Sequence, residues 1–313
     1  MATPMSGDAD LDSRGAANVR IATAPVNWNN FDLEDWRPTV PFPGILDRMF
    51  EAGYRDTEYD RSFGTDSGLL REAAESRGMS YIGAYVWFDF LDEQTFVTNL
   101  ERLDAMLPLL TEIGCRHLIV SDRLRPHRVA LAGSVPADGS TSLGLDEYAA
   151  LGARVRRVAE RASADGIGVH YHNHVGTYIE APMELAALRR HLDRALVDLC
   201  FDTGHYAYGG GDAARFLREH IRDIGLLHLK DVDPSVRDSA RTHGWSFLEA
   251  LRHYVFCPLG DGAADIRGIA GTLRAGRFPH HVVIEQDTCS GDPTETARRN
   301  REFLQSLIET PPL

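Results

Sequence analysis

Three histidines at alternate positions are the feature of this sequence that most strongly suggests chemistry. His170, His172 and His174 follow an apolar lead-in, and Glu180 closes the same stretch. Residues two apart on a strand point to the same face, so we expect the three imidazoles to project together. A polar stripe is costly inside an ordinary core, because each buried ring needs a partner. The pattern therefore predicts a metal or catalytic site.

Other residues with ligand-type side chains stand late in further apolar runs. A single late-strand aspartate is often a turn or cap residue, and a single histidine between leucines can belong to a core. Four successive runs that each supply a histidine or carboxylate instead predict one shared ion. Mixed imidazole and carboxylate ligands favour Mn²⁺ or Co²⁺, with Zn²⁺ or Fe²⁺ as alternatives, over the all-oxygen sites of Mg²⁺ and Ca²⁺. The candidates beyond the histidine stretch are Glu58, Asp202, His205, His228, Lys230, Asp231, Glu285 and Asp287.

The segments that must position these residues alternate between short apolar runs and helical patterns. Strands are expected at 19–28, 54–59, 80–87, 116–121, in the histidine stretch from 166, and at 197–205, 224–231 and 281–287. Helices are expected at about 41–52, 67–77, 93–113, 146–164, 181–192, 212–220, 265–275 and 294–308, with long connections at 122–145 and 232–265. Eight strand–helix units with near-continuous apolar strands predict an α/β fold, a (β/α)₈ TIM barrel formed as a single domain.

An open doubly wound sheet is the alternative fold, but no G-x-G-x-x-G motif follows the first strand. Barrel chemistry gathers at the carboxyl ends of the strands. The candidate residues all fall late in their predicted strands, as a barrel requires.

The composition limits which kinds of partner and which cellular compartment are expected. The chain has 313 residues and a net charge of −13, which argues against nucleic acid as a partner, and it lacks the apolar run of about 20 residues that a membrane span needs. The four cysteines form no C-x-x-C pair, as expected for reduced thiols in a cytoplasmic protein. Residues 1–17 are expected to form a disordered leader before a catalytic domain at 18–313. A homo-oligomer is compatible with the sequence.

Several motifs resemble those of the xylose-isomerase-like TIM-barrel superfamily, over about residues 19–308. These are Phe201-Asp-Thr-Gly-His205, His228-Leu-Lys-Asp231 and Val283-Ile-Glu-Gln-Asp287. That superfamily contains sugar isomerases and epimerases, repair enzymes of the endonuclease IV type, and myo-inosose dehydratases. The resemblance is greatest to the inosose-dehydratase branch, through Ala24-Pro-Val-Asn-Trp28, Gly53-Tyr-Arg-Asp-Thr-Glu58, His172-Asn-His-Val-Gly-Thr177 and Cys257-Pro-Leu-Gly-Asp-Gly262.

The resemblance implies one ion held by a residue from each of the last four strands. The matching positions are Asp202, His228, Glu285 and a strand-5 residue, most closely His172, with His174 and Glu180 as rivals. In the isomerases and epimerases the strand-5 ligand is a glutamate, so the histidine here departs from their paired-carboxylate mechanism. The residues expected to take part in catalysis are Glu285, His172, His205 and Lys230, and those expected to contact substrate are Trp28, Glu58, His174 and Glu180.

The resulting functional expectation is a metal-dependent lyase that dehydrates a keto-cyclitol or keto-sugar, a small polyol-like molecule. The alternatives are an isomerase or epimerase acting on a free or phosphorylated ketose, and a 3-keto-glycoside lyase. A non-catalytic carbohydrate-binding barrel is disfavoured, because the ligand-type residues are present. Trp28, Tyr85, Trp87 and Trp245 are hypothesised to form an aromatic rim around the substrate.

Overall fold

The computed structural model describes residues 19–33, 35–276 and 278–309. The leader predicted at 1–17 lies outside the described residues. Within the described part, no helix is long and apolar enough to cross a membrane.

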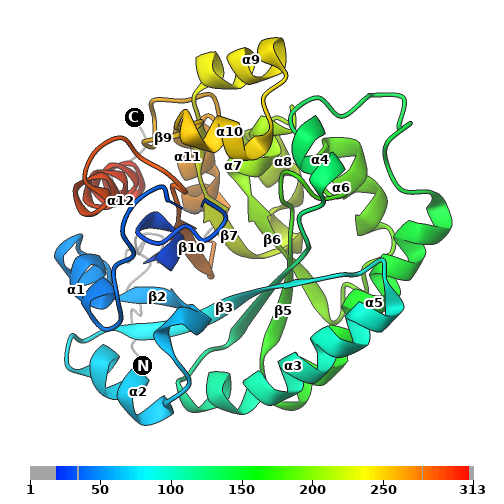
Figure 1. The fold of residues 1–313 in the computed structure, drawn as a ribbon. Helices are drawn as coiled ribbons and strands as arrows, with labels where there is room; N and C mark the ends of the chain where they lie inside the picture. Colours follow the sequence, from blue (N-terminus) through cyan, green and yellow to red (C-terminus); the bar gives the residue numbers. More distant parts are fainter. Residues whose placement is uncertain (1–18, 34, 277, 310–313) are drawn as a thin grey trace, which may run out of the picture.

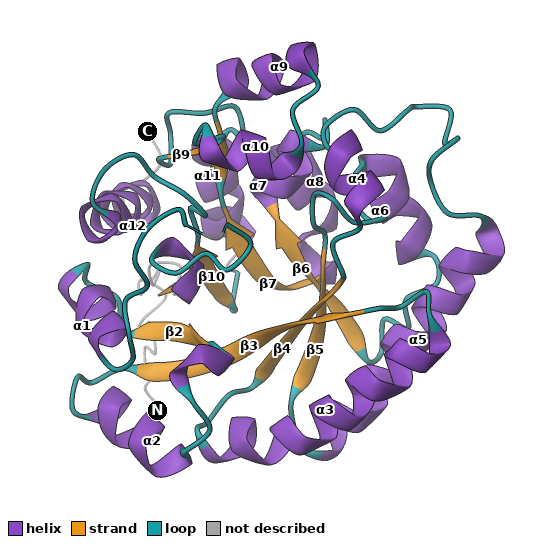
Figure 2. Ribbon diagram, viewed as in Figure 1, coloured by secondary structure: helices purple, strands orange, loops and turns teal. Residues whose placement is uncertain are grey.

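Eight parallel strands close into a barrel at the centre of the molecule (Figure 2), which confirms the predicted fold. The strand order around the barrel is β1-β10-β7-β6-β5-β4-β3-β2. The strands are β1 (Arg20–Thr23), β2 (Asp56–Tyr59), β3 (Ser80–Phe88), β4 (His117–Asp122), β5 (Gly168–His172), β6 (Val197–Asp202), β7 (Ile224–Leu229) and β10 (His281–Ile284).

Helices surround the barrel, and the last one packs beside the first to complete the ring (Figure 1). Aspartates in front of several helices accept a backbone N–H of the first turn and so fix where these helices begin, as Asp66, Asp92 and Asp212 do. The main helices are α1 (Gly44–Glu51), α2 (Ser67–Glu75), α3 (Glu93–Glu112), α5 (Leu145–Ala164), α6 (Pro182–Arg189), α8 (Ala213–His220), α11 (Ile266–Gly276) and α12 (Pro293–Glu309).

Several predicted strands are shorter than expected, and those predicted at 224–231 and 281–287 end at Leu229 and Ile284. The strand predicted at 19–28 ends at Thr23, and a 3₁₀ helix, η1 (Pro25–Asn27), follows, because a proline cannot donate to the strand ladder. The strand predicted at 197–205 ends at Asp202. Its carboxylate accepts the backbone N–H of His205, which starts α7 (Thr203–Tyr208) and places His205 on a helix.

Both long connections contain structure that the sequence patterns did not predict. The segment 122–145 contains α4 (Pro126–Leu131). The segment 232–265 contains α9 (Pro234–His243) and α10 (Phe247–Arg252). It also contains the short strand β9 (Phe256–Cys257), which pairs antiparallel with β8 (Asp231–Val232). Figure 1 shows α4 and α10 side by side at one end of the barrel. Short 3₁₀ helices η2 (Arg61–Phe63) and η3 (Ile221–Asp223) complete the described elements.

Apolar side chains fill the space between barrel and helices, but only a thin apolar layer lies inside the barrel. That inner layer consists of Ala22, Ala24, Ile82, Ile119, Cys200, Leu226 and Val283. Because side chains alternate along a strand, the next inward-facing positions toward the carboxyl ends are those of the predicted site. The predicted polar site therefore lies directly above this thin apolar layer inside the barrel.

Candidate metal centre

Four adjacent strands bring their late, inward-facing side chains together. His172, Asp202, His228 and Glu285 come from β5, β6 and β7 and from the residue that follows β10, and all four are buried. The Nδ1 atom of His228 lies 3.1 Å from a Glu285 carboxylate oxygen and 4.0 Å from one of Asp202. The rings of His172 and His228 have centroids 4.8 Å apart. The sequence prediction that these residues converge agrees with the structure.

Glu58 lies under this cluster rather than beside an open cleft. Its carboxylate accepts a hydrogen bond from Nε2 of His228 at 2.8 Å. This contact orients the ring so that Nδ1 faces Glu285 and Asp202. Such an arrangement, a carboxylate behind a histidine, is typical of histidines that bind metal through the other nitrogen. Glu58, predicted as a substrate contact, is instead placed to position His228.

Lys230 extends its ammonium group into a ring of carboxylates. Its Nζ lies 3.0 Å from Asp202, 2.6 Å from Glu285 and 3.1 Å from Asp287. Burial opposes a charged amine, but these three carboxylates hold the pKa of Lys230 well above its ordinary value. The group is therefore an ammonium ion at neutral pH and acts as a donor.

His174 and His205 pack against each other near the ammonium group, with ring centroids 3.8 Å apart and ring planes tilted by 36°. Burial holds the pKa of His205 well below its usual value and lowers that of His174 to about 4, so both rings are neutral at pH 7. Nδ1 of His174 donates to the carbonyl of Val175 at 2.7 Å. The lone pair of this ring therefore lies on Nε2. Nε2 of His205 lies 3.4 Å from Nζ of Lys230.

The residues present fit a bound divalent ion. Within the described residues, Nδ1 of His172 is buried and lacks a hydrogen-bond partner, which is costly unless another group satisfies it. Nδ1 of His228 and one oxygen of Asp287 have only ion-pair contacts, the nearest with Glu285 and Lys230 at 3.1 Å each. Three sets of donor atoms converge within 4.8 Å: His172 with His174 and His205, His172 with Cys200 and His228, and Glu58 with His228 and Glu285. Asp202 is not in these sets, and its carboxylate accepts a hydrogen bond from Lys230 at 3.0 Å. Imidazole and carboxylate donors are those of a borderline transition metal.

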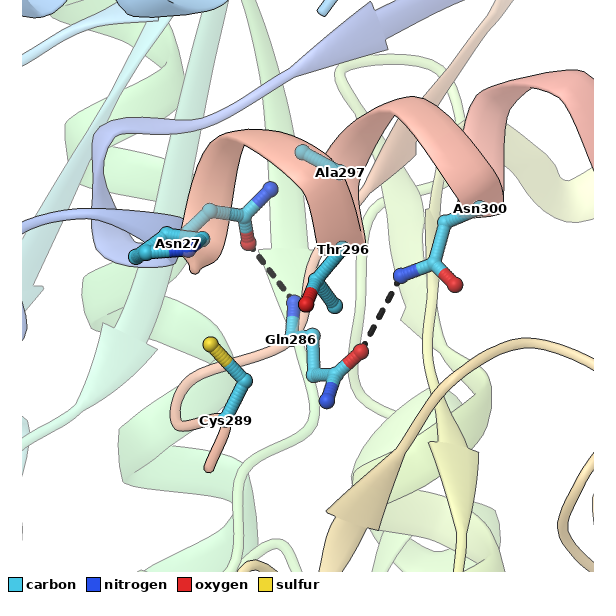
Figure 3. Close-up of a pocket in the computed structure, with 7 residues that line it drawn as sticks. Asn27, Gln286, Cys289, Thr296, Ala297 and Asn300 are labelled. Carbon is cyan, nitrogen blue, oxygen red and sulfur yellow. Dashed lines mark hydrogen bonds between the residues drawn. The ribbon is translucent and has the colours of Figure 1, made fainter. Parts of the chain in front are cut away.

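A buried amide network behind β10 fixes the residue between Glu285 and Asp287. Gln286 donates its backbone N–H to Asn27 at 2.7 Å, and its side-chain oxygen accepts from Asn300 of α12 at 3.1 Å. Figure 3 shows this network at the small pocket between η1, the segment after β10 and α12. Since Gln286 points out of the barrel, its neighbours on either side point in. The network therefore sets the direction of both carboxylates.

Three residues predicted for the site lie elsewhere. Trp28 is 1% exposed in the core, and its indole N–H donates to Thr294 at 3.1 Å, so it packs between barrel and α12 instead of meeting substrate. Glu180 accepts the backbone N–H groups of Gly133 and Gly176 at 2.6 and 2.8 Å, and so holds two loops together. His170 lies at the opposite end of the barrel, where its Nε2 is 2.9 Å from His117.

Two other candidates, Asp231 and Trp245, also have structural contacts outside the cluster. Asp231 binds the backbone N–H groups of Gly260, Gly262 and Ala264, which makes it a loop anchor. Trp245 stacks against His253, away from the cluster. Sequence analysis assigned no role to Cys200, although the alternation of side chains along β6 places it one inward-facing position before Asp202.

The chain matches known proteins over most of its length. It is 29% identical over 293 residues to an inosose dehydratase of Geobacillus thermodenitrificans, covering 92% of this chain and 96% of the relative. Its fold is similar to that of the probable 3-DHS dehydratase AsbF of Bacillus anthracis, with a TM-score of 0.70, 12% identity and coverage of 92% and 99%. It is also similar to the IolI protein with a bound zinc atom, with a TM-score of 0.69, 12% identity and coverage of 93% and 98%.

The profile of the family described as xylose isomerase-like TIM barrel matches residues 46–307, so the chain belongs to this family.

Proposed function

We propose that the protein is a metal-dependent lyase that removes water from a keto-cyclitol or a related keto-sugar. The observation that carries the proposal is the Lys230 ammonium group beside two neutral imidazoles, all in contact with one cluster of metal-type ligands. Elimination of water needs one base and one acid of unlike strength. The relatedness to an inosose dehydratase supports the same reaction class.

The ion would be held by His172, Asp202, His228 and Glu285, with Mn²⁺ or Co²⁺ as the proposed metals. When bound, the ion supplies a Lewis acid that polarises the substrate ketone and acidifies the adjacent C–H. Because Lys230 shares oxygens of Asp202 and Glu285, it would lie next to any group bound there.

Each proton transfer is assigned to a residue whose other hydrogen bonds leave the reacting nitrogen available. Nε2 of His174 carries a lone pair and takes the α-proton, because Nδ1 is committed to Val175. The ammonium of Lys230 donates a proton to the departing hydroxyl, which leaves as water. His205 lies between them and keeps their separation. An epimerase would instead need two similar bases on opposite faces of the substrate, and the strand-5 histidine replaces the second carboxylate.

The test is the mass of the product. Metal-loaded protein incubated with a keto-cyclitol is expected to give a product lighter by one water, while the Lys230→Met variant, folded and metal-loaded, gives none. Products of unchanged mass from cyclitol and ketose substrates alike would replace this proposal with an isomerase or epimerase. Release of an aglycone from a 3-keto-glycoside, without water loss from a cyclitol, would replace it with a glycoside lyase.

We also infer a cytoplasmic location, which the four unpaired and buried cysteines support.

A further inference from the structure

Two large aromatic side chains on β3 remain open to solvent although they belong to a barrel strand. Tyr85 is 40% exposed and Trp87 is 39% exposed. The hydroxyl of Tyr85 forms a 2.6 Å hydrogen bond with Ser121 of β4, and its ring meets that of His172 edge-on at 5.8 Å. Trp87 lies two residues further along the same strand and so on the same side. These two rings form a wall that rises from the metal centre toward solvent.

A carboxylate lies near Tyr85 on the loop that follows β1, which only β2 separates from β3 in the barrel. Asp32 donates its backbone N–H to Asn30 at 2.9 Å, and Asn30 donates to the carbonyl of Asp287 at 3.1 Å, so the loop is tied to the end of β10. Asp32 is open to solvent, yet surrounding protein raises its pKa, and Lys230 works in the opposite direction.

The Asp32 carboxylate is free to bind a ligand. No described residue forms a hydrogen bond or ion pair with its oxygens, and the nearby Lys230 is committed to Asp202, Glu285 and Asp287. A lone carboxylate is a hydrogen-bond acceptor only, and it is well suited to two neighbouring hydroxyl groups. The exposed face of an aromatic ring such as that of Trp87 suits the apolar C–H face of a saturated ring.

The charged groups at the site disfavour the binding of an anionic ligand. Five carboxyl groups lie at the site, on Asp32, Glu58, Asp202, Glu285 and Asp287, against the ammonium of Lys230 and the imidazole of His228. The arginines that follow β4 are paired already: Arg123 with Asp89, and Arg125 with Asp89 and Asp122. With carboxyl groups in excess and these arginines already paired, the site is poorly suited to a substrate phosphate.

We propose that Asp32 and the β3 wall of Tyr85 and Trp87 form the specificity subsite for a neutral, unphosphorylated ring polyol. Asp32 accepts hydrogen bonds from two adjacent hydroxyl groups on the part of the ring away from the ion, while the ring stacks on Trp87. This inference deepens the proposed function and rests on it for the identity of the reacting end of the substrate.

The test is binding of an unreactive polyol, myo-inositol, to the metal-loaded protein by calorimetry. Asp32→Asn is expected to weaken binding about 10-fold or more, because a charged acceptor is lost, whereas the exposed control Asp165→Asn leaves binding unchanged. With a keto-cyclitol substrate, Asp32→Asn is expected to raise KM by a similar factor and to change kcat little. Trp87→Phe should remove the tryptophan fluorescence change that follows polyol binding.

Polyol binding that is equal in the wild type and Asp32→Asn would overturn the inference. So would a phosphorylated ketose that binds as tightly as its unphosphorylated form. These outcomes are separate from the fate of the proposed reaction, since binding is measured without turnover. If polyol binding falls in Asp32→Asn but no water is eliminated from any substrate, the subsite stands and the lyase assignment fails.

Discussion

At the scale of single residues, His228 shows how the site is organised. One ring nitrogen is bound by Glu58, and the other faces Glu285 and Asp202. Burial disfavours a charged imidazole, but the thiol of Cys200 and these carboxylates together raise the pKa of His228 well above its ordinary value. An ion of charge +2 in the same place would take over the role of the proton. The ring is therefore held ready to exchange a proton for a metal.

The first prediction concerns Glu58. Replacing it with alanine leaves Nε2 of His228 without its acceptor, so metal affinity or activity is expected to fall about 10- to 100-fold. Glu58→Gln keeps an acceptor oxygen and should lose less. The measurements are metal content by elemental analysis and kcat. Wild-type metal affinity in Glu58→Ala would show that the contact does not position the ring, and the exposed Glu72→Ala serves as control.

The second prediction separates the two histidines of the strand-5 end. His172 shares donor sets with Cys200, His228 and His174, while His174 has one nitrogen committed to Val175. His172→Ala is therefore expected to lose the ion. His174→Ala should keep the ion and lose kcat. Elemental analysis of both purified variants decides the assignment, and the reverse pattern would make His174 the ligand.

Sequence reasoning located most of this cluster because side chains alternate on strands and because barrel sites gather at the carboxyl ends. It could not separate Glu58 from the substrate contacts, since whether a carboxylate meets a ligand or a histidine depends on the strand across the barrel. Sequence reasoning also misplaced Trp28. The 3₁₀ helix that begins at Pro25 turns the chain after β1, and Trp28 at its end packs against Thr294 of α12.

At the scale of elements, the loops at the barrel mouth are held by buried charges. Arg128 of α4 pairs with Glu184 of α6 at 2.9 Å, and neither side chain is exposed. Arg128 also donates to the carbonyls of Thr177 and Thr141, and Glu184 accepts the backbone N–H groups of Glu180 and Ala181. The pair thus joins the connection 122–145 to the segment that follows the histidine strand.

The third prediction follows from that pairing. Arg128→Met leaves the Glu184 carboxylate buried without its cation, so the free energy of unfolding is expected to fall by about 3–5 kcal/mol. The double variant Arg128→Met/Glu184→Gln should recover part of this loss. Denaturant titration measures it, with Arg156→Met as control, because the Arg156–Glu160 pair is exposed to solvent and contributes little to stability. Equal losses in both arginine variants would contradict the role assigned to α4.

The strand and helix order could be predicted because hydrophobic periodicity and glycine stops are local signals. The helices within the connections 122–145 and 232–265 could not be predicted from these local signals. Helices α4, α9 and α10 are short, and their stability comes from contacts with distant segments, such as the hydrogen bonds from Arg128 and the β8–β9 pair.

At the scale of the whole molecule, the barrel is polar at both ends. The end opposite the candidate site contains His117, His170 and His281, with Gly225 opposite His170, where any larger residue would collide with the ring. Burial lowers the pKa of His117 and His281 to about 4 and that of His170 well below its ordinary value. Charged and titratable neighbours at this end are Arg20, Asp56, Asp198 and His280.

The fourth prediction is a loss of stability in mild acid that originates at this end. Between about pH 6.5 and 4 the unfolded chain protonates these histidines while the folded chain does not. Protons therefore favour unfolding, so stability is complete above about pH 6.5 and falls as the pH drops, by about 1.4 kcal/mol per pH unit for each histidine. His170→Leu keeps a ring-sized side chain against Gly225 and removes one such group, so its stability should depend less steeply on pH over this range. The exposed control His127→Gln should run parallel to the wild type. Denaturant titrations at several pH values measure the slopes, and a His170→Leu slope equal to that of the wild type would show that His170 does not contribute to the acid sensitivity.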